Sequence, residues 1–348
     1  YDRAEGNPFF TEELAYAIRD SGLITVADGH CHLDPASGDL QSVQLPNTIQ
    51  GLITSRIDRL TPSQQLTLKV ASVIGRSFEY VTLHGIHPIE TEKGHLSDYL
   101  HSLDQLDITQ LEKPEPAPAY SFKETVTQEV AYNMMLFAHR RELHRAVANW
   151  YEIYHADDLR SFSALLGYHY RKAGDVPKAL DFSERAGEEA LRTFANEEAI
   201  RFFGQALEMA SKADGNIAPK TRQARWEMKL GEAYVNWVKF SDGQIHLERG
   251  LELLGYPVPK NQIRLGLALA REVVRQFFYR LKPNAGRLPG DQTQLLLEAA
   301  RAYEGLTAVY YFASETLLSL YAAFRSLNLA EAAGPSPELA RGYTSVGA

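Results

Sequence analysis

Apolar residues recur every three or four positions along most of this chain, which predicts a mainly α-helical protein. Near its start, Asn7 can cap a helix and Pro8 suits the first helical position, so a short helix is expected to run to about residue 21. The next clear runs predict three further helices, over residues 49–60, 62–74 and 92–106. Thr61 and Gln64 match a capping box at the start of the second of these.

Two stretches have the residues of β-hairpins rather than of helices. Residues 23–44 mix glycine, aspartate and serine with short apolar runs, which indicates a loose hairpin. Further on, "ITQLE" (108–112) and "AYSFK" (119–123) are separated by three prolines, which exclude a helix there and favour a two-stranded wing. Helices followed by a small hairpin describe a winged-helix domain. Because residues 92–107 are rich in acidic side chains, we expect this domain to face a protein or a nucleotide rather than DNA.

The helical pattern resumes after the hairpin and runs to about residue 155. Apolar residues spaced three and four apart, among them Leu143, Val147 and Trp150, predict the buried side of this segment. Five basic residues are expected on the opposite, solvated side: His139, Arg140, Arg141, His144 and Arg145.

A helical repeat begins near residue 160. The combination Leu166, Gly167 and Tyr170 recurs as Leu230, Gly231 and Tyr234, which is the pattern of small and aromatic residues in tetratricopeptide helix pairs. Small residues at the expected later positions are Ala179, Ala186, Ala199, Ala206, Gly243 and Gly250. Small side chains let paired helices approach closely, and the tyrosine fills the space one turn later. Since the spacing is irregular, the prediction is an irregular α-solenoid rather than a fixed number of repeats.

Composition limits the classes of function. The chain has 348 residues, is 45% apolar and carries a net charge of −8, so we expect a folded, multi-domain protein with no general attraction to nucleic acid. Its single cysteine, Cys31, fits a reducing compartment, and a cytoplasmic location is expected. The "GHCHLD" segment (29–34) is interpreted as an ordinary loop and not as a metal site.

Two apolar segments raise the question of a membrane. Residues 306–324 approach the length of a bilayer span, but Glu315 lies within them, so a buried solenoid helix is the preferred interpretation. Residues 271–283 form a basic amphipathic pattern in which Val274, Phe277 and Phe278 are expected to pack inside the solenoid. A membrane is therefore not expected as a partner.

Several motifs together resemble one family. They are "EGNPFFTEEL", "LPNTIQGLITSRIDRL", "VASVIGRSFEY", "YSFKETVTQEVAY", "RRELHRAVANWYE" and "HYRKAGDVPKAL", and they cover roughly residues 1–210. They resemble the signal-transduction ATPases with numerous domains (STAND), in particular the group fused to class III adenylate/guanylate cyclase domains. The resemblance implies the end of an ATPase lid with a hairpin linker over 1–44, a winged-helix domain with its following helix over 45–158, and a tetratricopeptide-like solenoid over 159–348, cut short at its C-terminal end.

The resemblance also implies candidate nucleotide contacts. Gly6, Asn7 and Pro8 match a turn that meets the nucleotide base and ribose in that family, and the free amides of a helix start favour anions. Glu124 stands where related proteins present a histidine to the bound diphosphate. A carboxylate would repel phosphate there, so either the diphosphate-bound state is weakened or Lys123 makes the contact instead.

No phosphate-binding loop of the Gly-x4-Gly-Lys-Ser/Thr type occurs in the chain, so no catalytic residue is assigned and this chain alone is not expected to hydrolyse ATP. The resemblance implies that ATP or ADP with magnesium binds in a complete parent, whose nucleotide-binding core and effector domain precede this region. The sequence thus predicts a sensor region that controls a cyclase and binds a protein ligand through its solenoid. Two alternatives remain: the same region of a transcription regulator with a DNA-binding effector, and a tetratricopeptide scaffold without a nucleotide.

Overall fold

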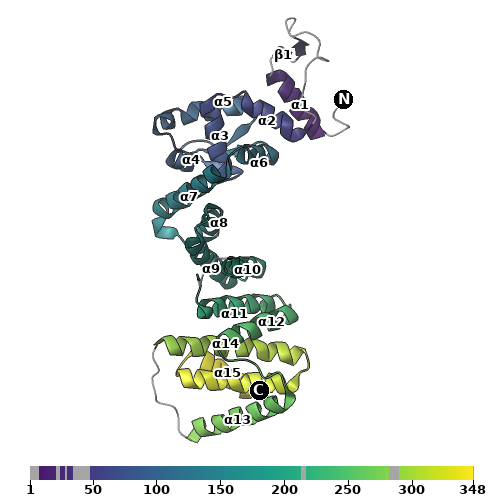
Figure 1. Ribbon diagram of the computed structural model, residues 1–348, viewed down its shortest axis with the longest axis vertical. Coiled ribbons are helices and arrows are strands. Elements are labelled where there is room, and N and C mark those ends of the chain that lie inside the picture. The colour runs from purple at the N-terminus through teal and green to yellow at the C-terminus, as the bar shows by residue number, and fades with distance from the viewer. Residues whose placement is uncertain are drawn as a thin grey trace. The chain divides into compact units, whose positions relative to one another are not determined.

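The computed structural model of the protein describes residues 8–20, 24–27, 30–33, 48–212, 217–281 and 290–347. The chain divides into two compact units. Unit 1 contains residues 1–157 with 172–174, and unit 2 contains residues 158–171 with 175–348. Each unit has its own buried core, and helices make up most of both (Figure 1).

Unit 1 combines helices with two small antiparallel sheets. Its helices are α1 (Pro8–Asp20), α2 (Ile49–Asp58), α3 (Pro62–Ile74), α4 (Tyr80–Ile86), the 3-10 helix η3 (Glu90–His95), α5 (Leu96–Gln105), α6 (Thr125–Asn133) and α7 (Phe137–Tyr154). A hairpin joins β1 (Ile24–Ala27) to β2 (His30–Leu33). The second sheet has the order β3-β5-β4, built from Ser77–Glu79, Ala119–Phe122 and Thr109–Lys113. The predicted wing is therefore present and gains β3, whose three residues are too few to show an alternating pattern.

Local sequence signals set the ends of the helices in unit 1. The Thr61 side chain accepts from the backbone N–H of Gln64, and the Gln64 side chain accepts from the Thr61 N–H, so the predicted capping box starts α3. The predicted helix over 92–106 instead begins at Leu96, after η3. Gly94 lies within η3, and glycine disfavours a regular α-helix.

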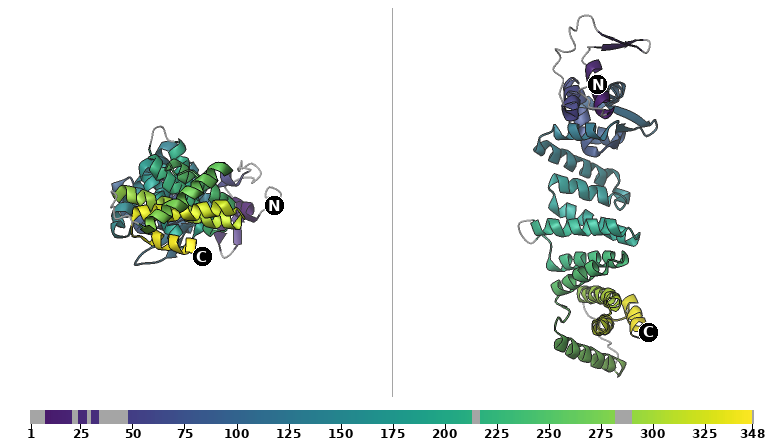
Figure 2. Two further views of the ribbon diagram at one scale, coloured as in Figure 1. Left: turned by 90° about the horizontal axis from the view of Figure 1, so that it is seen from below. Right: turned by 90° about the vertical axis from the view of Figure 1, so that its right-hand side faces the viewer.

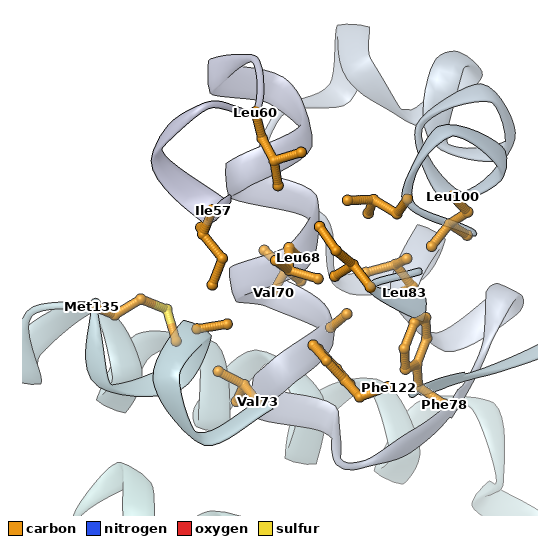
Figure 3. Close-up of a cluster of buried hydrophobic side chains, with 14 of the residues drawn as sticks. Ile57, Leu60, Leu68, Val70, Val73, Phe78, Leu83, Leu100, Phe122 and Met135 are labelled. Atoms are coloured by element: carbon orange, nitrogen blue, oxygen red, sulfur yellow. The ribbon is translucent and has the colours of Figure 1, made fainter. Parts of the chain in front are cut away.

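The core of unit 1 lies between the helices and the three-stranded sheet. Leu68, Val70 and Val73 of α3 lie at its centre, with Phe78 and Phe122 from the sheet on one side (Figure 3). Where α4 meets α7, only glycine fits, because a Cβ atom on Gly85 would lie 1.9 Å from Nε1 of Trp150. The periodic leucines and valines of the sequence thus converge on one core.

His144 does not lie on the solvated side of α7, as the sequence predicted. It is buried, and its Nε2 lies 3.0 Å from the hydroxyl of Tyr132 on α6. That hydroxyl provides the polar partner that allows an imidazole to be buried. Burial, followed by the nearby charges of Lys172 and Arg140, lowers the pKa of His144 to about 4.

Unit 2 is built from helices, most of which pack against the next helix in the chain (Figure 2). They are α9 (Val176–Arg192), α10 (Asn196–Lys212), α11 (Lys220–Asn236), α12 (Phe240–Leu253), α13 (Gln262–Leu281), α14 (Gly290–Phe312), α15 (Thr316–Ala333) and α16 (Pro337–Gly347). The short η4 (Ala156–Asp158) and α8 (Ser163–Ala173) lie at the division between the units. The prediction of a mainly α fold with an irregular tetratricopeptide-like solenoid is confirmed. The finer assignment of a lid over 1–44 and of a winged helix over 45–158 stays a prediction.

Three helix-to-helix turns in unit 2 have the same geometry. A residue with φ near +60° stands in each turn: Phe194, Val238 and Ser314. The N–H of the next residue donates to the carbonyl five positions back, at 2.8 Å from Ala195 to Ala190, 2.9 Å from Lys239 to Tyr234 and 2.9 Å from Glu315 to Tyr310. This is the bond of a Schellman motif, which ends one helix and reverses the chain. The repeat that the residue pattern predicted is thus also present in the backbone.

Small residues hold α11 and α12 close together, as the sequence predicted. A Cβ atom on Gly231 would lie 2.7 Å from the Leu247 side chain and 3.0 Å from the carbonyl oxygen of Gly243. Any larger residue would push the two helices apart, and this position coincides with the recurring Leu-Gly-x-x-Tyr pattern.

Two expectations about the apolar segments need correction or refinement. Residues 306–324 are not one helix, because α14 ends at Phe312 and α15 begins at Thr316, with Glu315 as its N-cap residue. The expectation that the apolar residues of α13 pack inside the solenoid is wrong, since Val274, Phe277 and Phe278 are all more than half exposed. In the described ranges, the membrane-span criterion of length and hydropathy is met by none of the helices.

Candidate functional site

The predicted nucleotide contacts lie at the start of α1 and at the end of β5. Gly6 and Asn7 lie outside the described residues. Pro8 is the first residue of α1 and is exposed. Lys123 and Glu124 directly follow β5, and Glu124 is the N-cap residue of α6, although its side chain makes no capping hydrogen bond.

The structure brings Lys123 to α1. Its Nζ donates to the Tyr16 hydroxyl at 2.8 Å and to Oδ1 of Asp107 at 3.1 Å. Arg19 of the same helix also donates to Asp107, at 3.0 Å. Tyr16 lies eight residues after Pro8, about 12 Å along the helix axis at 1.5 Å per residue. Lys123 and Pro8 are thus connected through one helix, but the charge of Lys123 already has a carboxylate partner.

The contacts among Lys123, Asp107 and Arg19 shift the pKa values of Asp107 and Lys123. Burial alone would raise the pKa of Asp107, but the hydrogen bonds from Arg19 and Lys123 outweigh it and hold the pKa below its ordinary value. The hydrogen bond to Tyr16, with the charge of Asp107, raises the pKa of Lys123. A phosphate group could reach Lys123 only in competition with Asp107.

A larger candidate site lies in unit 2, as a groove of about 650 Å³. Its floor is apolar and includes Phe203 of α10, Trp226 and Met228 of α11, and Leu247 of α12. Its walls are charged and come from α9, α11, α14 and α16. A concave surface with an apolar floor and a few convergent polar groups is the usual form of a binding site.

Ion pairs position most of the charged wall. Arg225 of α11 lies 2.8 Å from Oε1 of Glu298 on α14, and Arg341 of α16 lies 2.9 Å from Oε1 of Glu304 on α14. These pairs connect helices that are far apart in the sequence. They hold α11, α14 and α16 in fixed positions around the groove. They also balance the charge of both arginines.

Two groups in the groove lack such partners. Glu188 of α9 has no close ion pair among the described residues, although the charges of Lys229, Arg225 and Arg185 act on its carboxylate. Partial desolvation, followed by the nearby carboxylate of Glu184, raises the pKa of Glu188. Trp226 is fully buried, and its indole N–H has no acceptor among the described residues. The groove therefore presents the carboxylate of Glu188 to a ligand, whereas the indole N–H of Trp226 is buried beneath the surface.

Sequence reasoning did not find the groove. A signal was present on α11, where Arg225, Lys229 and Glu232 recur at helical spacing beside the recognised Leu230-Gly231 pair. Charged residues at that spacing are usually read as a solvated helix face, and only the packing of α11 against α14 shows that they line a cavity. In the described residues, His, Cys, Asp and Glu side chains form no group of three that could hold a metal ion. The side chains of the "GHCHLD" segment (29–34) lie outside the described residues, so the interpretation of that segment stays a prediction.

Comparison with solved structures shows a weak likeness. No family model and no curated protein matches the chain. Among solved structures, it is similar to a signal-transduction ATPase with numerous domains that has a tetratricopeptide repeat sensor, from Pyrococcus horikoshii. The identity is 11% and the TM-score 0.31, over 99% of this chain and 52% of the other, so this chain spans about half the length of that protein. A TM-score this low carries no argument about fold or function.

Proposed function

We propose that this chain is the regulatory and sensor region of a larger signal-transduction ATPase, and that the groove of unit 2 binds its protein ligand. The groove is the observation that carries the proposal. It combines an apolar floor with charges held by ion pairs between α11, α14 and α16. A peptide segment with mixed polarity suits such a surface, because its apolar side chains reach the floor while its polar groups meet the walls.

Glu188 defines the ligand further. A lysine or arginine of the ligand would form an ion pair with Glu188 and offset the repulsion between Glu188 and Glu184. The proposed ligand is thus a protein segment that carries a basic residue near an apolar one.

Peptides selected from a random library for binding to the chain, and then measured by titration calorimetry, test this proposal. The Glu188→Arg variant is expected to weaken binding by about tenfold or more, because it places a positive charge opposite the basic residue of the peptide. Glu198→Arg, an exposed charge reversal on α10, is the matched control and should leave affinity unchanged. Peptides that bind both variants equally well would place the protein-binding surface outside the groove.

The nucleotide part of the proposal rests on the family resemblance. We infer that the parent switches between ADP- and ATP-bound states and controls a class III cyclase, with Gly6, Asn7 and Pro8 beside the nucleotide. Titration of ATP into this chain alone is expected to show no micromolar binding, because it lacks a phosphate-binding loop. In a protein that includes the nucleotide-binding core, Glu124→His should slow ADP release. An unchanged release rate would mean that Glu124 only starts α6.

A further inference from the structure

The helix α13 has both apolar and polar residues on its inner side, where Leu265 joins the core of unit 2, and large apolar residues on its outer side. Its buried residues include Glu272, which is fully buried, and Gln276. The exposed fractions on the outer side are 76% for Ile263, 70% for Leu267, 54% for Val274, 62% for Phe277 and 63% for Phe278. A helix on the surface of a soluble domain normally turns its large apolar residues inward.

Polar contacts hold α13 in this orientation. Within unit 2, α13 packs on α15, and both figures show α15 on one side of it (Figures 1 and 2). Glu272 accepts from Arg325 of α15 at 2.8 Å, and Asn328 of α15 donates to Oε2 of Glu272 at 2.9 Å. A buried carboxylate with these partners resists reversal of the helix, because turning it outward would leave Arg325 without its charge partner.

The outer face forms a long, convex and basic stripe. From Ile263 to Phe278 it extends about 22 Å at 1.5 Å per residue. Arg264, Arg271 and Arg275 accompany the apolar residues, while the only acidic residue of the helix, Glu272, is buried. Arg271 and Arg275 lie 3.3 and 3.5 Å from the carboxylate of Glu272, which is shared with Arg325, so the face carries surplus positive charge.

From these observations, we infer that α13 binds the surface of an anionic lipid bilayer, with Phe277, Phe278 and their neighbours inserted among the lipids and the arginines at the headgroups. Amphipathic helices with basic flanks and large apolar residues lie in the bilayer interface in this manner. A second copy of the chain is a poorer occupant, since two such faces would bring arginines together. An acidic helix of a partner protein would need a groove in which to lie, and the outer face of α13 is convex.

This inference is independent of the proposed ligand groove, whose lining residues come from other helices. It also does not depend on the net charge of −8, because a lipid surface responds to the charges within about 10 Å of it at ordinary salt.

Sedimentation of the full 348-residue chain with vesicles tests it. Binding is expected to vesicles of phosphatidylcholine mixed with phosphatidylglycerol, to weaken as salt is added, and to be much weaker with phosphatidylcholine alone. The double variant Phe277→Ser/Phe278→Ser should lower the partition coefficient by about tenfold or more, because both side chains lose their burial in the lipid. Arg271→Gln/Arg275→Gln should remove the preference for the anionic lipid.

The matched control is Phe137→Ser/Phe194→Ser, which removes two phenylalanines that are 72% and 77% exposed elsewhere. This variant should bind vesicles as the original chain does, and circular dichroism should show unchanged helix content in all three variants. Equal loss of binding in the control, or no binding to anionic vesicles, would overturn the inference. So would a dimer in solution that Phe277→Ser/Phe278→Ser dissociates, because a second copy would then cover the face.

Discussion

Arg56 of α2 and Glu13 of α1 form a buried ion pair, with Nη1 2.9 Å from Oε2 and side chains that are 3% and 2% exposed. Arg56 also donates to the carbonyl of Leu106 at 2.7 Å, and its guanidinium lies 4.6 Å from the centre of the Tyr16 ring. This pair fixes α1 to the rest of unit 1, next to the Tyr16–Lys123 contact. The position of the predicted nucleotide-facing helix therefore depends on it.

Replacing only one partner of this pair should be costly. Glu13→Gln is expected to lower the free energy of unfolding of unit 1 by about 3–5 kcal/mol, because it replaces the carboxylate that pairs with the buried Arg56 charge by a neutral amide. The double variant Glu13→Leu/Arg56→Met should recover most of that loss. Urea unfolding of the single and double variants measures the coupling, and a double variant as unstable as the sum of the single ones would contradict it.

Acid should weaken unit 1 through His144. The native state keeps this imidazole neutral down to a pKa of about 4, while the unfolded chain takes up a proton near 6.5. Stability from this group is therefore fully present above pH 6.5 and is lost as the pH falls toward 4, to a total of about 3 kcal/mol. In His144→Gln, the free energy of unfolding measured with urea should fall less steeply between pH 6.5 and pH 4 than it does in the original chain. The same pH dependence of stability in both chains would mean that His144 also takes up its proton in the native state over this pH range.

The turn between α11 and α12 should tolerate glycine better than the residue it has. Val238 has φ +61°, a conformation that costs a β-branched residue about 1–2 kcal/mol, and its side chain is 69% exposed. Val238→Gly should raise the stability of unit 2 by about 0.5–1 kcal/mol after the entropic cost of glycine. Lys239→Gly, at φ −94°, is the control and should give no gain. Thermal unfolding distinguishes the two, and a lower melting temperature for Val238→Gly would count against strain at this turn.

The buried amide of Gln276 should be replaceable by a hydrocarbon. Both of its polar atoms are buried, and neither has a hydrogen-bond partner among the described residues. Gln276→Leu is expected to stabilise unit 2 by about 1–3 kcal/mol, since no desolvated amide remains. Gln262→Leu, on the exposed start of the same helix, should change stability by less than about 0.5 kcal/mol. If urea unfolding shows Gln276→Leu to be destabilised, the amide has a structural role on α13.

Local signals in the sequence were sufficient for most elements. The capping box of Thr61 and Gln64 places the start of α3, and the prolines between residues 113 and 118 separate the two strands of the wing. The Leu-Gly-x-x-Tyr pattern locates the close contact at Gly231. Such features act within a few residues, so they can be recognised before any packing is known.

Features that depend on distant partners could not be predicted in this way. His144 looks like a surface residue until Tyr132 of another helix is placed beside it. The apolar face of α13 looks like a core face because periodicity does not reveal which side of a helix is covered. The groove requires side chains that are far apart in the sequence, such as Glu188 and Arg341, to line the same cavity. In each case tertiary packing decides the outcome.

The composition of the groove has a thermodynamic consequence. Its walls take side chains from α9, the first long helix of unit 2 in the sequence, and from α16, the last, so a bound segment would contact both at once. By linkage, occupancy would suppress fraying of α16 and reduce relative motion of the intervening helices, in proportion to the affinity of the ligand. Ligand binding would then stabilise the helices of unit 2 together, so that binding at one helix lowers the mobility of the others.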